Sequence, residues 1–139
     1  MTARSLLRKV GLVFVANLLL VPILGTFAVG LLSGDPRLVL GTDIAGVPVL
    51  VYATMSTAIP VIAVTVFGLI ILGELGKPGP RRQYIAVVAV VFGAAGGALF
   101  GLLLFGGFRI AFAGLLTGTI CSVVDVLIWR ASTGTADLA

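Results

Sequence analysis

The sequence FGAAGGALFG, residues 92–101, lies inside an uncharged run that extends from residue 84 to residue 108. Its glycines Gly93, Gly97 and Gly101 recur every four residues. Residues with this spacing share one face of an α-helix, so the three glycines form a row without side chains against which a second helix can pack closely. The stretch therefore predicts a membrane helix that packs through glycine, in the manner of a glycine zipper.

A second row of small residues follows in the next uncharged run, at Gly114, Gly118 and Ser122, again with a spacing of four. We expect only residues 107–109 to link the two segments. Helices joined by so short a connection are antiparallel neighbours. The sequence thus predicts that the two small-residue rows face each other.

The composition of the whole chain indicates a membrane protein. Of its 139 residues, 60% are hydrophobic and 10% are charged, whereas about a quarter of the residues of a soluble protein are charged. Four uncharged runs are each close to the roughly 20 residues that a helix needs to cross a bilayer. We place the spans at residues 10–32, 47–73, 84–106 and 110–129. The predicted fold is all-α, a four-transmembrane-helix bundle in which residues 1–139 form a single membrane domain.

The basic residues are distributed unevenly about these spans. Seven of the nine lie on the side that holds both chain ends: Arg4, Arg8, Lys9, Lys77, Arg81, Arg82 and Arg130. By the positive-inside rule both termini are expected in the cytoplasm, with the basic side chains at anionic lipid head groups rather than on nucleic acid. Trp129 is expected at the same interface. Without an evident eukaryotic targeting signal, we expect a multi-pass protein of a prokaryotic plasma (inner) membrane.

Two prolines are predicted to bend the first two helices. Pro22 and Pro60 each lie near the centre of a span, where a proline removes a backbone donor and displaces a carbonyl group. Hydroxyl side chains of the second span are expected to satisfy the backbone that Pro60 frees. Asn17 precedes the first bend and is expected to bond either to its own backbone or to a neighbouring helix.

The sequence offers little for catalysis. It contains no histidine and a single cysteine, Cys121, so an intrachain disulfide is excluded and a metal or haem site has almost no ligands. We therefore expect no enzyme activity, no cofactor and no metal site.

Asp125 is the one acidic residue within the predicted spans. An ionisable residue in a membrane helix is a functional candidate by default, because its exposure to lipid is costly. Thr117 and Ser122 lie on the same side of its helix and, with Asn17, complete the candidate ion, solute or partner site. Asp125 could alternatively form a structural ion pair, for example with Arg130, which follows by about 7.5 Å along the helix.

Three functions fit these features. The chain is rich in packing surface and poor in chemistry, which favours an accessory, assembly or stabilising subunit that binds a membrane partner. The alternative is a homo-oligomeric channel or transporter of a small solute or ion, with Asp125 in the pathway. A holin-like pore former is the third. The expected partners are the lipid bilayer and either further copies of the chain or another membrane protein.

Overall fold

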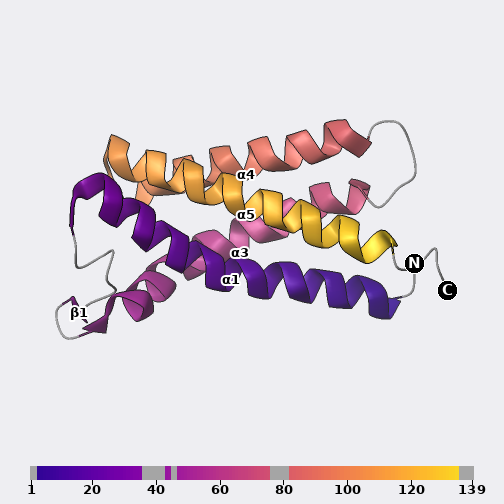
Figure 1. Ribbon diagram of the computed structural model, residues 1–139, viewed down its shortest axis with the longest axis horizontal. Coiled ribbons are helices and arrows are strands. Elements are labelled where there is room, and N and C mark those ends of the chain that lie inside the picture. Colours follow the sequence, from indigo (N-terminus) through magenta and orange to yellow (C-terminus); the bar gives the residue numbers. More distant parts are fainter. Residues whose placement is uncertain (1–2, 36–42, 45–46, 76–81, 135–139) are drawn as a thin grey trace.

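The computed structural model describes residues 3–35, 43–44, 47–75 and 82–134. The described elements are helices α1 (Ala3–Ser33), α3 (Val49–Leu75), α4 (Arg82–Phe105) and α5 (Phe108–Gly134), and strands β1 (Asp43–Ile44) and β2 (Val47–Pro48). The two strands pair antiparallel, with Asp43 opposite Pro48. The predicted all-α four-helix bundle is confirmed, because the long helices run side by side with alternating direction (Figure 1).

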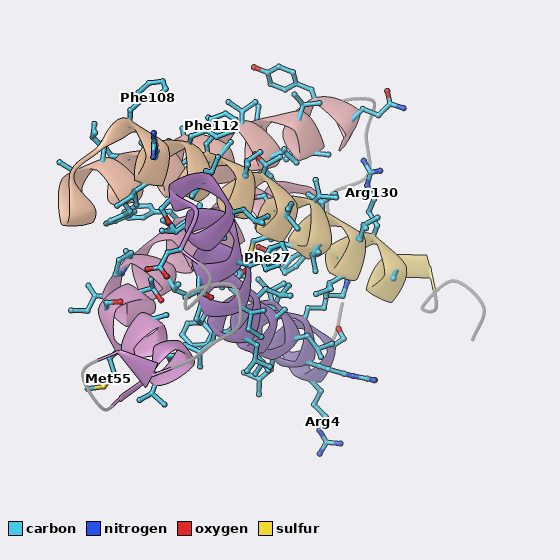
Figure 2. The ribbon with its side chains drawn as sticks, turned by 60° about the vertical axis from the view of Figure 1, so that its left-hand side comes forward. Arg4, Phe27, Met55, Phe108, Phe112 and Arg130 are labelled. Atoms are coloured by element: carbon cyan, nitrogen blue, oxygen red, sulfur yellow. The ribbon has the colours of Figure 1, made fainter. Side chains whose placement is uncertain are left out.

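All four helices are long and apolar enough to span a membrane. Large exposed apolar side chains occur on every helix, among them Leu19, Ile59, Val91 and Leu127. Met55, 75% exposed, and Phe108, 86% exposed, point away from the bundle (Figure 2). A surface that is apolar on all sides suits lipid rather than water, and the chain is a multi-pass membrane protein.

The helix boundaries differ from the predicted spans by a few residues. α1 starts at residue 3 rather than 10, so Lys9 is part of the helix. The predicted start of the second span, residue 47, falls on β2. Phe108 opens α5, which reduces the expected link between the last two helices to Gly106 and Gly107. Both have positive φ, 59° and 127°, a conformation that favours glycine and allows this reversal in two residues.

The helices are arranged in the cyclic order α1, α3, α4, α5. α4 and α5 form the most extensive pair, whereas the diagonal pair α3 and α5 barely touches. We call the end of the bundle where α1 begins and α5 ends the termini end, and the opposite end, which carries β1 and β2, the hairpin end (Figure 1).

The structure places the two small-residue rows against each other. A methyl group built on Gly97 would overlap the carbonyl of Gly114, and one on Gly114 would overlap the carbonyl of Gly97. Gly118 meets the carbonyl of Gly93 in the same way. A Cβ on Gly101 would lie 2.6 Å from the carbonyl oxygen of Ile110. α4 and α5 therefore approach backbone to backbone, at a separation that any side chain at these positions would prevent.

The termini end of the bundle is tightly packed. Its buried side chains, which we call the termini-end layer, are Val13, Leu72, Ala86, Ala89, Val126 and Trp129. Trp129 is only 2% exposed, so it does not face lipid, and its expected position at the level of the membrane interface stays a prediction. Lys9, expected at lipid head groups, is 3% exposed, and its Nζ lies 5.5 Å from the centre of the Trp129 ring. Because Lys9 lies on the helix, its stem packs inward and its ammonium rests on the indole face.

Candidate functional site

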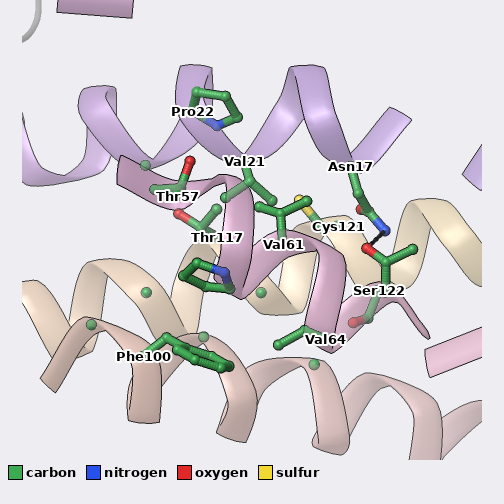
Figure 3. Close-up of a pocket in the computed structure, with 18 of the residues that line it drawn as sticks. Asn17, Val21, Pro22, Thr57, Val61, Val64, Phe100, Thr117, Cys121 and Ser122 are labelled. Carbon is green, nitrogen blue, oxygen red and sulfur yellow. Dashed lines mark hydrogen bonds between the residues drawn. The ribbon is translucent and has the colours of Figure 1, made fainter. Parts of the chain in front are cut away.

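A cavity of about 260 Å³ lies between the four helices, and each helix contributes to its lining (Figure 3). On α5 the lining runs from Ile110 to Asp125. These residues are 15 positions apart, which corresponds to about 22 Å along the helix axis. The cavity is thus an elongated space inside the membrane-spanning part of the bundle.

The cavity is not symmetric along the bundle. Towards the hairpin end its lining reaches Val29, four residues before α1 ends, and Ile110, two residues after α5 begins. Towards the termini end it stops at Asp125, nine residues before the end of α5. The termini-end layer fills the bundle beyond that point. The cavity has the form of a cup, with its floor at the level of Asp125 and its wall rising towards the hairpin end.

Three helices meet in a hydrogen-bonded group at this floor. The side-chain Nδ2 of Asn17 on α1 donates to Oδ2 of Asp125 on α5 at 2.9 Å and to Oγ1 of Thr65 on α3 at 3.2 Å. Asn17 and Thr65 are each 4% exposed. Arg130, the ion-pair partner considered from the sequence, is exposed on the surface, whereas Asp125 lines the cavity. The carboxyl group is therefore part of the bundle interior.

Several buried oxygen atoms in the described part of the cavity lining have no hydrogen-bond partner. They are Oδ1 of Asp125, Oδ1 of Asn17 and Oγ1 of Thr117. Thr117 lies eight residues before Asp125, about 12 Å towards the hairpin end. Buried polar atoms in proteins are usually hydrogen-bonded, and leaving one unpaired costs free energy. A hydrogen-bond donor or a cation would therefore bind most favourably beside these acceptors, at the floor and halfway up the wall.

The hydroxyl groups near the prolines bond within their own helices. Thr57 Oγ1 and Ser56 Oγ donate to the carbonyl of Ala53 at 2.6 and 3.1 Å. We expected them to satisfy the carbonyl of Ser56, which Pro60 displaces, but their bonds lie one turn earlier. On α1, which changes direction near its middle (Figure 1), Thr26 Oγ1 donates to the carbonyl of Pro22 at 2.7 Å.

Within the described ranges, the lining carries one formal charge. Asp125 is the sole carboxyl group among these lining residues, and no lysine or arginine is among them. Apart from the hydroxyl and amide groups and the buried thiol of Cys121, the wall consists of glycine, alanine, valine, isoleucine, proline and two aromatic rings, Phe92 and Phe100. The site is an apolar chamber with one acidic group at its floor.

All four candidate residues from the sequence, Asn17, Thr117, Ser122 and Asp125, line this cavity. Of these, the structure joins Asn17 and Asp125 by a hydrogen bond. The two prolines and the five packing glycines line it as well: Pro22, Pro60, Gly93, Gly97, Gly101, Gly114 and Gly118.

Thr65 was missed. It lies on one face of α3 with Thr57, Val61 and Gly68, a row of small or hydroxyl residues at helical spacing that could have identified it.

In the described ranges, no three histidine, cysteine, aspartate or glutamate side chains are grouped so that they could hold a metal ion. Compared with protein-family models, with curated proteins and with solved structures, the chain matches none of them. A function for the chain is therefore inferred from the cavity.

Proposed function

We propose that this protein transports a small solute across the membrane and binds it in the cavity of its own four-helix bundle. The observation that carries the proposal is the Asn17–Asp125 hydrogen bond at the floor of that cavity. A carboxyl group within a membrane helix is costly unless it is paired, and here one oxygen accepts a hydrogen bond from Asn17 whereas the other is buried without a partner.

The backbone around the cavity supports this proposal. Pro22 and Pro60 interrupt the hydrogen bonding of two lining helices, and the other two contribute glycines, which have no side chain, to the lining. Membrane transporters use such irregular or uncovered backbone around a site near the middle of the bilayer. The termini-end layer is then the barrier that a solute must pass. Because one bundle of four helices is narrow, we propose that the working unit is a homo-oligomer.

The hypothesis of an accessory subunit requires an apolar face reserved for a partner. The exposed apolar side chains of the described helices are spread over the whole bundle, as contact with lipid alone requires. Among the described helices, no one face of the bundle is more apolar than the others. The accessory function is therefore the alternative that the flux test below must exclude.

The test is a flux measurement in proteoliposomes with a panel of monovalent inorganic cations, organic ammonium ions, amino acids and sugars. Gly25 lines the cavity, and a Cβ built on it meets nothing within 4 Å, so Gly25→Val adds a side chain to the lining at a position with open space around the Cβ. Gly11 on the same helix also has open space around it but does not line the cavity, which makes Gly11→Val the matched control.

We expect at least one class of solute to give a protein-dependent flux that Gly25→Val reduces at least about tenfold and Gly11→Val leaves intact. If no class gives a flux and a mild-detergent pull-down recovers a second membrane protein in a constant ratio, the transport proposal is wrong. The accessory function would then hold.

A further inference from the structure

We propose that the solute is an amphipathic organic cation, with its charged group at the Asp125 carboxylate and its apolar body extending towards the hairpin end. This inference rests on the proposed function and names the class of solute. It follows from three properties of the described cavity: the sign of its charge, the position of that charge, and the chemistry of the remaining wall.

The first property is charge. Among the described residues, one carboxyl group and no basic side chain line the cavity, so this lining favours a positive ligand over a negative one. Oδ2 of Asp125 is held by Asn17, while Oδ1 has no hydrogen-bond partner. Asn17 is only 4% exposed, and its Oδ1 is a second buried acceptor without a partner at the same floor. A cationic group placed here would gain both oxygens.

The second property is position. The carboxyl group is at one end of the chamber, and the lining extends about 22 Å away from it along α5. A ligand that pairs with Asp125 therefore has room for a body on one side only. This geometry matches a molecule with its charge at one end.

The third property is the wall. Beyond the floor it is mainly apolar, with side chains such as Val21, Val61 and Val64 and the ring of Phe100, and the hydroxyl groups there are few (Figure 3). Apolar and aromatic groups favour an apolar body, and aromatic faces also attract cations. The unpartnered hydroxyl oxygen of Thr117, halfway along, can accept a hydrogen bond from an N–H or O–H group on that body.

Other solute classes fit less well. Divalent cations need about six or more oxygen ligands, and the floor offers a single carboxylate beside an amide and a hydroxyl. A sugar would leave most of its hydroxyl groups against apolar side chains, which is costly. An anion would meet the Asp125 carboxylate.

The experiment measures binding of benzyltrimethylammonium to the purified full-length protein in nanodiscs. Its neutral isostere, neopentylbenzene, has the same shape without the charge and serves as the competitor. Trp129 is the single tryptophan and lies one helical turn from Asp125, so its fluorescence reports on the floor of the cavity. Isothermal calorimetry provides a readout that does not depend on Trp129.

We expect benzyltrimethylammonium to bind, and the neutral isostere to compete at least about tenfold more weakly, because it cannot pair with the carboxylate. Asp125→Asn, which keeps the shape of the side chain, should weaken binding of the cation at least about tenfold and leave binding of the isostere unchanged. Glu74→Gln removes one carboxyl group at an exposed position outside the cavity. This control variant should bind the cation and the isostere as the unmodified protein does.

Two results would overturn the inference. One is equal binding of the cation and the isostere with no effect of Asp125→Asn, which would show an uncharged apolar site. The other is no binding of benzyltrimethylammonium by a protein that carries a different solute in the flux panel. In both cases the cavity would still be a solute site and the proposed function would stand, so the two failures can be told apart.

Discussion

At the scale of single residues, the Asn17–Asp125 pair determines the cost of keeping a carboxyl group inside the bundle. An interhelical hydrogen bond in a membrane contributes only about 0.6 kcal/mol on average. A carboxyl group without a partner costs about 2.5 kcal/mol or more at the centre of a membrane helix, and Asp125 lies nearer one end of its span. Asn17 therefore contributes more to stability by lowering the cost of the buried carboxyl group than by binding α1 to α5.

This comparison predicts a specific double-mutant cycle. Asn17→Leu alone should lower the free energy of unfolding by about 2–3 kcal/mol, because it leaves Asp125 without its donor. Asn17→Leu combined with Asp125→Leu should be more stable than Asn17→Leu alone, since the uncompensated group has been removed. Reversible unfolding in mixed micelles, followed by circular dichroism, measures each variant. A double variant less stable than both single variants would contradict the explanation.

The residues that sequence reasoning identified and those that it missed differ in physical character. Asp125 and Asn17 are conspicuous because polar groups are rare in apolar segments. Such side chains are expected to face the interior of the bundle rather than lipid. Lys9 and Trp129 were placed at the lipid interface because both residue types are common there. The structure buries them against each other, a pairwise contact between α1 and α5 that no single-helix pattern encodes.

At the scale of elements, the length of the uncharged runs predicted the four helices, because an uncharged run of about 20 residues in a bilayer has few alternatives to a helix. Their ends were less predictable. α1 continues through Arg4, Arg8 and Lys9, whose charges suggested a boundary, since charged side chains are compatible with a helix once it leaves the hydrocarbon. The cavity was not predictable, because it depends on how four helices pack together rather than on one.

The contact between α4 and α5 gives an element-scale prediction. Gly97→Ala would drive its methyl group into the carbonyl of Gly114, and backbone on both sides cannot yield without separating the helices. We expect a loss of about 1–3 kcal/mol. Gly96→Ala, one residue away, meets only a side-chain methyl group of Val64, at 3.3 Å, which a shift of a few tenths of an ångström relieves, and should cost much less. Thermal unfolding of the two variants tests the difference, and equal midpoints would refute a backbone-to-backbone contact.

At the scale of the whole molecule, the asymmetry of the cavity and the distribution of charge together predict the side of the membrane from which a solute enters. The termini end is packed and the cavity extends towards the hairpin end. Seven of the nine basic residues flank the spans on the side of the termini, which predicts that this side is cytoplasmic. Together these features predict that the cavity extends away from the cytoplasm and that a solute reaches Asp125 from the outer side of the membrane.

Cys121 allows this direction to be measured, because it is the single cysteine and it lines the cavity one turn from Asp125. A membrane-impermeant cationic methanethiosulfonate should modify Cys121 faster in right-side-out vesicles than in inside-out vesicles. Cys121→Ser gives the background, and a reporter fused to the C-terminus establishes which side the termini occupy. Faster modification from the side of the termini would contradict the prediction, since the termini-end layer lies between that side and the thiol. Slow modification from both sides that benzyltrimethylammonium does not change would argue against solute access to the cavity.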